Sequence, residues 1–333
     1  MRESFDRIIG DKLIMDEPAN IDIWSRLQIR YVKLHFHLRM LEDSILPKHK
    51  VSALRGGMGE MLLRANCIRD RKCENCDFAS ECIVRRMMYS QMEIQPEFMK
   101  RGDSVGYVLE CENYEEHFTA GEELTFQLIL FGRNIVYFNQ YLQAFAYLGM
   151  QGIGKYRSRY VIEHVTNTQR DIVVEGDQVY KKNYVVQTVE EYVRYRMQSG
   201  QTEDTIVFHT PAAIRHRGQM MDQIDADAVM ASVIRRIYIL DCFEGIAAGK
   251  AEIAGHIPAV RSQKCRKVSV ERYSSTHDEK IRLTGICGSA VIEIPDEMAW
   301  SLLYAGELIH IGKNTSFGFG RYSLSKSRGG EMT

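Results

Sequence analysis

The sequence VKLHFHLR, residues 32–39, alternates strictly between apolar and basic side chains. Successive side chains of a β-strand point to opposite faces, so this stretch would place its apolar side chains on one face and its basic side chains on the other. It therefore predicts a strand with one buried face, and the rest of the fold is built outward from it.

A helix is predicted after this strand. Beyond Pro47, apolar residues recur at spacings of three and four, which is typical of one buried helical stripe; they are Leu54, Met58, Met61, Leu62 and Ala65. Strands are then predicted at 106–110 and 122–131, a helix at 134–148 and a strand at 156–165. The order strand, helix, strand, strand, helix, strand is that of a ferredoxin-like domain.

The second half of the chain repeats this order. We predict a strand at 205–210, a helix at 225–243, strands at 267–273 and 280–294, a helix at 296–305 and a last strand that ends near Tyr322. A polar stretch at 198–204 would be the linker. The triplet Ile153-Gly154-Lys155 recurs as Ile311-Gly312-Lys313, which favours an internal duplication.

The predicted fold class is therefore α+β, with two tandem ferredoxin-like (RRM-like) domains. The N-terminal domain would comprise residues 1–200, with a four-cysteine insertion at 67–82. The C-terminal domain would comprise residues 201–333, with a glycine-rich loop at 312–320. The length of 333 residues agrees with two domains at roughly 150 residues each.

The charge balance excludes a global attraction to nucleic acid or membrane. There are 43 basic and 44 acidic side chains, a formal charge of −1, so any such binding must be local. No apolar run approaches the roughly 18 residues that indicate a membrane-spanning helix, and the first residues lack the apolar core of a signal peptide. We expect a cytoplasmic protein.

Four of the eight cysteines form a compact pattern. Cys67, Cys73, Cys76 and Cys82 have the spacing C-x5-C-x2-C-x5-C, in which the central pair can chelate one ion from a tight turn. Four thiolates suit a tetrahedral structural zinc site, which we predict here. An iron–sulfur cluster and free thiols are the alternatives.

The segment GKNTSFGFGRY, residues 312–322, combines glycines with Lys313, Phe317 and Arg321. Its glycines stand in the wrong order for a P-loop, which excludes a standard ATP site. Flexible backbone donors, cations and aromatic rings suit the clamping of single-stranded nucleic acid, although a simple turn would explain the glycines alone. Basic residues also gather at Arg215 and His216 and around Arg272, where a solvent-facing strand is the alternative.

Several motifs occur in a fixed order along the chain. They are Leu54-Arg55-Gly56-Gly57-Met58-Gly59 before the cysteines, Leu148-Gly149 with Gly152-x-Gly154 and a basic segment after it, Thr210-Pro211, Glu271-Arg272-Tyr273-Ser274, Leu283-Thr284-Gly285 with Gly288, and the glycine-rich loop. From residue 27 to residue 322, the chain resembles the RAMP-fold CRISPR-associated endoribonucleases that process precursor crRNA at its repeats.

The resemblance implies two ferredoxin-like domains that grip a repeat RNA, with the glycine-rich loop on the RNA-facing side. It also implies cleavage without a metal cofactor, in which a ribose 2′-hydroxyl attacks the neighbouring phosphate and leaves a 2′,3′-cyclic phosphate and a 5′-hydroxyl. We assign RNA binding to basic and aromatic residues, namely Arg55, Lys155, Arg157, Arg215, His216, Arg272, Lys313, Phe317 and Arg321. Expected partners are the CRISPR repeat RNA, its crRNA product and subunits of a CRISPR effector complex, with no membrane partner.

This cleavage needs a base, an acid and a cation near the phosphate. In much of the family the catalytic histidine lies beyond the first helix of the N-terminal domain, but here the cysteines occupy that stretch. His49, beside Lys48 and Lys50 at the break before the first helix, is our first candidate. Lys50, Tyr31 and His37 complete the predicted catalytic set. The remaining histidines considered are His35, His209, His216, His277 and His310.

Two other functions are compatible with the sequence. The first is a non-cleaving RAMP subunit that holds RNA inside an effector complex, and cleavage by the isolated chain would distinguish it. The second is a small-molecule-binding regulatory protein with tandem ferredoxin-like domains, which would lack tight, salt-dependent RNA binding.

Overall fold

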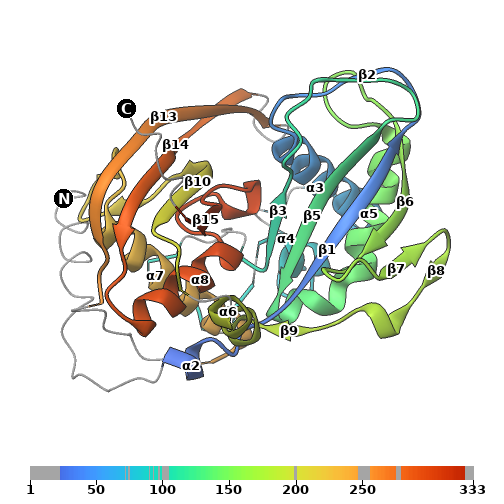
Figure 1. Cartoon of the computed structure of the whole chain (residues 1–333). Helices are drawn as coiled ribbons and strands as arrows, with labels where there is room; N and C mark the ends of the chain where they lie inside the picture. The colour runs from blue at the N-terminus through green and yellow to red at the C-terminus, as the bar shows by residue number, and fades with distance from the viewer. Residues whose placement is uncertain are drawn as a thin grey trace, which may run out of the picture.

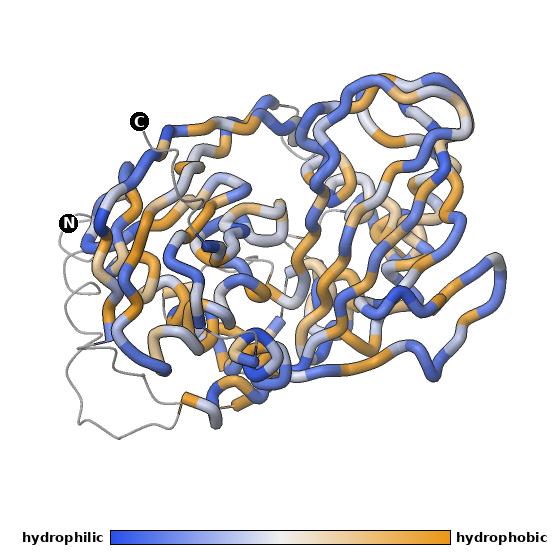
Figure 2. Tube along the Cα trace, viewed as in Figure 1, coloured by the Kyte–Doolittle hydropathy of each residue, from blue (hydrophilic) through white to orange (hydrophobic). Residues whose placement is uncertain are grey.

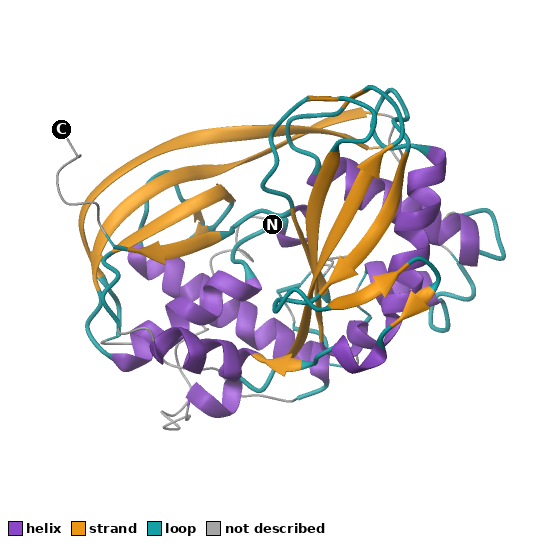
Figure 3. Ribbon diagram, turned by 45° about the vertical axis from the view of Figure 1, so that its right-hand side comes forward, coloured by secondary structure: helices purple, strands orange, loops and turns teal. Residues whose placement is uncertain are grey.

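The computed structural model describes residues 23–326, except for positions 72, 74–75, 90, 93, 97, 100–104, 199–200, 247–255 and 275–278. The described residues form two main antiparallel sheets, each with helices packed on one face (Figures 1 and 3). Within this part of the chain, no helix has the combination of length and apolar character that crossing a bilayer requires.

The N-terminal sheet has the strand order β3-β5-β1-β6. Its principal elements in chain order are β1 (Arg30–Met40), α3 (Val51–Asn66), β3 (Tyr107–Glu110), β5 (Glu123–Phe131), α5 (Phe138–Gln151) and β6 (Tyr160–Thr166). Helices α3 and α5 cover the face that carries Leu34, Phe36 and Leu38, whose side chains are fully buried. The alternation of apolar and hydrophilic residues along β1 and β5 is visible in Figure 2.

The C-terminal sheet has the equivalent order β13-β14-β10-β15. Its elements in chain order are β10 (Thr205–Ala212), α7 (Ala226–Glu244), β13 (Ala259–Ser274), β14 (Glu279–Glu293), α8 (Glu297–Ile309) and β15 (Tyr322–Ser325). Both halves therefore have the ferredoxin-like order, and the predicted fold class is confirmed.

Three strand limits differ clearly from the predictions. Strand β6 begins at Tyr160 rather than at residue 156, because residues 154–157 form a turn. Strand β13 begins at Ala259 rather than at residue 267, and its first part pairs with β14 although several of its side chains are basic and exposed. Alternation of apolar residues was therefore a poor guide to where it begins. The last strand begins at Tyr322 rather than ending there, because the glycine-rich loop occupies the residues before it.

Smaller elements fill the connections. They are α2 (Ile23–Arg26), β2 (Ser44–Ile45), α4 (Ile83–Met88), β4 (His117–Phe118), η2 (Gly132–Tyr137), β7 (Ile172–Glu175), β8 (Gln178–Val179), η3 (Lys181–Asn183), β9 (Gln187–Thr188), α6 (Val189–Gln198), β11 (Arg215–His216), β12 (Gln219–Met220) and η4 (Thr315–Phe317). The sequence predicted no structure between the end of β6 and residue 198, where the chain extends the N-terminal sheet and then forms α6.

Helix α6 joins the two halves. Its Tyr192 donates a hydrogen bond to Glu307 of α8, and its Arg196 forms an ion pair with the same carboxylate at 3.0 Å. Tyr31 and Phe131 of the N-terminal sheet belong to the same buried cluster as α7 and α8. The hydrophobic core of the second half thus includes residues of the first.

Candidate functional site

A pocket lies where the start of α3 meets the glycine-rich loop. It is lined from the N-terminal half by His49, Lys50, Val51, Ser52, Glu110, Cys111 and Tyr114, and from the C-terminal half by Thr210, Pro211, Val270, Phe317, Gly318, Phe319 and Arg321. The pocket therefore brings together the segment before the first long helix and the loop after the last one.

His49 is the half-buried histidine of this pocket. Its ring contacts the ring of Tyr114 edge-on, with centroids 5.7 Å apart. Burial, followed by the charges of Lys48 and Lys50, lowers the pKa of His49 below its ordinary value of 6.5. The imidazole is therefore mainly neutral at pH 7, the form that accepts a proton.

The other predicted catalytic residues lie in different surroundings. Lys50 lines the pocket but is only 1% exposed, and its ammonium donates hydrogen bonds to the carbonyl oxygens of Asn113 and Glu115. It holds the loop after β3 against the start of α3.

Tyr31 and His37 do not line the pocket. Tyr31 is buried between the two halves, and its hydroxyl donates to Gln187 at 3.2 Å. His37 lies on the open face of the N-terminal sheet, where its ring stacks on His164 at 4.1 Å and its Nδ1 is 2.6 Å from Glu123. The structure thus keeps His49 and Lys50 together and separates Tyr31 and His37 from them.

Two arginines flank one aromatic ring at the edge of the pocket. The guanidinium groups of Arg55 on α3 and Arg272 on β13 each lie 4.7 Å from the ring centroid of Phe317. Burial and the nearby charge of Arg55 lower the pKa of Arg272. Because a phosphate would relieve this repulsion between like charges, the Arg55–Phe317–Arg272 cluster suits an RNA backbone.

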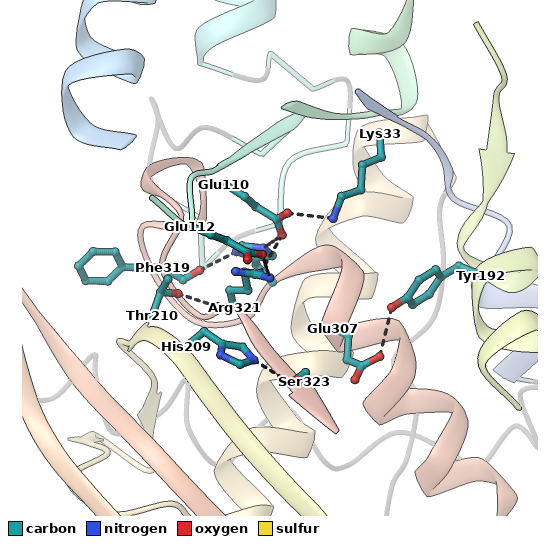
Figure 4. A network of polar contacts seen from close by, with 11 residues as sticks. Lys33, Glu110, Glu112, Tyr192, His209, Thr210, Glu307, Phe319, Arg321 and Ser323 are labelled. Atoms are coloured by element: carbon teal, nitrogen blue, oxygen red, sulfur yellow. Dashed lines mark hydrogen bonds and ion pairs between the residues drawn. The ribbon is translucent and has the colours of Figure 1, made fainter. Parts of the chain in front are cut away.

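A buried ionic network fixes the glycine-rich loop to the N-terminal half (Figure 4). The carboxylate of Glu110 is 2.9 Å from Lys33 Nζ, 2.7 Å from His310 Nε2 and 3.5 Å from Arg321 Nε. His310 Nδ1 is 3.0 Å from the carbonyl oxygen of Phe319, so both ring nitrogens face acceptors.

Burial alone would raise the pKa of Glu110, but Lys33, His310 and Arg321 together lower it well below its ordinary value. The carboxylate therefore stays ionised inside the protein. Arg321 is also paired with the exposed Glu112 and donates its backbone N–H to Thr210 Oγ1. Arg321 therefore holds the glycine-rich loop in place, and its charge is already neutralised by carboxylates of the protein.

The remaining predicted RNA-binding residues lie outside the pocket. Arg215 and His216 belong to the β11–β12 hairpin, where His216 pairs with Asp227 at 3.0 Å. Lys313 is exposed in the glycine-rich loop. Lys155 and Arg157 are exposed in the turn after α5.

The four clustered cysteines are half-buried between α3 and α4. Burial, followed by the neighbouring thiols of Cys82 and Cys67, raises the pKa of Cys73, so these groups lie close enough to interact. Four thiols are a suitable donor set for zinc. Among the described residues, however, no three side chains of the metal-binding types are gathered into coordinating positions. The metal site stays a prediction.

Sequence reasoning missed Tyr114 and Glu110. Tyr114 stands in an irregular loop without a recognisable motif, and only the fold brings it to His49. Glu110 ends a short apolar strand and is 3% exposed. A carboxylate in a buried strand was the one available signal, since such a group requires a cationic partner. His277 lies outside the described residues.

Each half of the chain matches a model of a known protein family. Residues 27–191 match a family model described as an N-terminal domain, and residues 206–322 match the model of the CRISPR-associated endoribonuclease Cas6. No curated protein sequence matches the chain.

Solved structures show the same fold. A partial Cas6-RT-Cas1–Cas2 complex and a Cas6-RT-Cas1–Cas2 complex each match with a TM-score of 0.57 and 10% identity over 92% of this chain. This chain spans 47% and 30% of those two chains. Thermus thermophilus Cas6 matches with a TM-score of 0.50 and 12% identity over 89% of this chain and 99% of its own. The second half therefore matches the Cas6 family of CRISPR-associated endoribonucleases, and the chain as a whole shares the fold of solved Cas6 structures.

Proposed function

We propose that this chain cuts CRISPR repeat RNA at the pocket between its two halves, without a metal cofactor, to produce guide crRNA. The observation that carries this proposal is the position of His49. A half-buried histidine with a lowered pKa faces Tyr114 and the glycine-rich loop, and the Arg55–Phe317–Arg272 cluster lies at the pocket edge.

In the proposed reaction, His49 accepts the proton of the ribose 2′-hydroxyl beside the scissile bond. The 2′-oxygen then bonds to phosphorus while the bond from phosphorus to the 5′-oxygen breaks. Burial raises the pKa of Tyr114, so its hydroxyl is protonated at neutral pH and can donate to the leaving 5′-oxygen. The proton on His49 then returns to Tyr114, and the products are a 2′,3′-cyclic phosphate and a 5′-hydroxyl.

The cationic cluster would stabilise the phosphate as negative charge builds on its oxygens. Arg55 and Arg272 approach Phe317 from different halves of the chain, so a phosphate bound there would also hold the halves together. Tyr31 and His37 have no place in this scheme because neither lines the pocket.

The test uses the host's repeat RNA in excess EDTA. We expect one cut that is abolished by a single 2′-deoxy substitution at the cleaved position, and a cyclic phosphate on the product. His49→Ala should lower the single-turnover rate by about 10²–10⁴-fold, the usual contribution of proton transfer. His209→Ala is the matched control, because His209 is exposed and outside the pocket.

Tight RNA binding without any cut would instead identify a non-cleaving RNA-holding subunit. A cut that survives His49→Ala would refute the assigned base. The complexes named for the matched structures contain RT, Cas1 and Cas2. They support a further proposal, that this chain works with CRISPR protein partners as well as repeat RNA.

We propose in addition that Cys67, Cys73, Cys76 and Cys82 bind one structural zinc ion, with an iron–sulfur cluster as the alternative. Because metal-binding free energy is folding free energy at such a site, chelation should lower the melting temperature. Elemental analysis of the purified chain should find about one zinc per chain, and Cys73→Ser with Cys76→Ser should abolish it. Cys265→Ser is the control. A metal-free chain that melts at an unchanged temperature would contradict the site.

A further inference from the structure

The two halves carry the same loop at the same position in the fold. Helices α5 and α8 are each followed by a residue with positive φ, Gly152 at 86° and His310 at 56°. Each of these precedes a fully buried isoleucine, Ile153 or Ile311. The repeated triplet of the sequence therefore marks equivalent structural positions.

The backbone closes both loops in the same way. The N–H of Ile153 donates to the carbonyl of Ser158 at 2.9 Å, and the N–H of Ile311 donates to the carbonyl of Gly320 at 3.2 Å. The closing residue is followed by Arg-Tyr in both halves.

The two tyrosines also make equivalent bonds. Tyr160 donates to the carbonyl of Phe145 in α5 at 2.8 Å, and Tyr322 donates to the carbonyl of Leu303 in α8 at 2.6 Å. The loop at residues 152–158, called the α5 loop below, is thus a shorter counterpart of the glycine-rich loop.

The α5 loop presents two cations and an aromatic ring to solvent. Residues 154–157 form a tight exposed turn. Tyr156 is 62% exposed, and Lys155 Nζ lies 5.3 Å from its ring centroid. Between described residues, no ion pair involves Lys155 or Arg157, whereas Arg159 is paired with Glu42. A ring flanked by unneutralised cations suits a stacked base and its phosphates.

This turn lies next to the segment that carries His49. A Cβ placed on Gly154 would be 3.5 Å from Pro47 Cδ. Pro47 is two residues before His49, a separation of at most about 7 Å along an extended chain. In Figure 1 the α5 loop and the loop between β1 and α3 lie at the same end of the N-terminal half. An RNA strand leaving the pocket on this side would pass over the α5 loop.

We propose that the α5 loop is a second contact for single-stranded RNA, which binds nucleotides that flank the cleaved bond. Tyr156 stacks on a base, and Lys155 and Arg157 contact phosphates. This inference rests on the proposed function for the choice of RNA, but it concerns affinity rather than the chemical step.

The test compares two matched triple variants. Lys155→Ser with Tyr156→Ser and Arg157→Asn removes the contact, and Asn tolerates the positive φ of 52° at position 157. The control, Lys181→Ser with Lys182→Ser and Tyr195→Ser, removes the same kinds of exposed groups away from the pocket. The probe is host repeat RNA with its natural flanks and a 2′-deoxy at the cleavage position, titrated at several salt concentrations.

We expect the α5-loop variant to bind about tenfold more weakly, since one base stack contributes about 1–3 kcal/mol. The slope of log K against log salt should fall by about 1.4, for two phosphate contacts at roughly 0.7 each. The control should match the wild type. Wild-type affinity and slope in the α5-loop variant, or equal losses in the control, would overturn the inference.

Cleavage separates this inference from the proposed function. With cleavable RNA in single-turnover assays, the enzyme concentration that gives half the maximal rate should rise about tenfold in the α5-loop variant. His49→Ala should instead bind normally and lower the maximal rate by about 10²–10⁴-fold. If the wild type fails to cut but the α5-loop variant still binds weakly, the nuclease proposal fails and the second contact stands. If the wild type cuts but the α5-loop variant binds normally, the nuclease proposal stands and the second RNA contact is refuted.

Discussion

At the scale of single residues, the proposed chemistry depends on the proton of His49. Its ring is half-buried and has lysines on both sides in the sequence, and burial and both charges lower its pKa below 6.5. A base must be neutral to act, so the single-turnover rate should rise with pH and show its inflection below pH 6.5.

The pH profile gives a sharp test of this assignment. Lys48 is exposed, so Lys48→Ala should leave the fold intact while removing a charge that lowers the pKa of His49. The inflection of the rate profile should therefore move to higher pH. Arg39→Ala, which removes an exposed cation outside the pocket, is the control. A rate that falls as pH rises through this range would show that His49 does not act as the base.

Local sequence features were enough to nominate His49 as a candidate base, but not to predict its contact with Tyr114. The position before the first helix and the flanking lysines are local features, and they sufficed to rank this histidine first. The contact with Tyr114 forms only because β3 brings its following loop beside the start of α3. Residues separated by more than sixty positions carry no local pattern that reports such a contact.

At the scale of elements, the glycines of α3 show how a helix is fitted to its neighbour. A Cβ on Gly57 would lie 2.4 Å from Cδ1 of Leu148 on α5, whereas a Cβ on Gly56 would meet nothing within 4 Å. Each glycine inside a helix costs roughly 1 kcal/mol relative to alanine, so glycines at these positions indicate close backbone packing. The sequence alone does not say which of them makes the contact, since adjacent positions of a helix face different directions.

This difference predicts opposite effects from the same substitution. Gly56→Ala should raise the free energy of unfolding by about 1 kcal/mol, the difference in helix propensity. Gly57→Ala should lower it by about 1–3 kcal/mol, the usual effect of overpacking. Urea unfolding of both variants measures this. If Leu148→Ala does not relieve the effect of Gly57→Ala, the loss has another cause.

Strands without regular apolar alternation were harder to predict from the sequence than strands with it. Strand β1 was found nearly to its ends, because its apolar side chains alternate. The first part of β13 was missed because basic side chains interrupt its pattern, and the length of that strand depends on pairing with β14. The repeated Ile-Gly-Lys triplet was visible in the sequence, but its matching hydrogen bonds required the structure.

At the scale of the whole molecule, Glu110 joins the two halves. It lies on β3 of the first half and binds His310, 200 positions later in the chain, together with Lys33 and Arg321. No periodicity or motif predicts a contact over that separation. The network nevertheless holds the glycine-rich loop in position relative to His49. The loop, His49 and Glu110 all line the same pocket.

The lowered pKa of Glu110 makes this junction sensitive to acid. In the unfolded chain its pKa is about 4.3. In the folded chain it is well below the ordinary value, because the effects of Lys33, His310 and Arg321 outweigh that of burial. The unfolded state therefore binds the proton more readily. The stabilisation is fully present above about pH 5 and is progressively lost as pH falls below about 4.

Glu110→Gln should accordingly destabilise the chain at pH 7 by about 3–5 kcal/mol, because it leaves buried cations without their anion. Its stability should also fall less steeply than that of the wild type between pH 5 and pH 3. Glu112→Gln is the matched control, since Glu112 pairs with the same Arg321 but is 59% exposed, and a surface pair contributes about 0–1 kcal/mol. Urea unfolding at pH 7, 5 and 3 measures both variants. Equal losses in the two variants, or parallel pH profiles for Glu110→Gln and the wild type, would mean that the Glu110 network adds little to the junction between the halves.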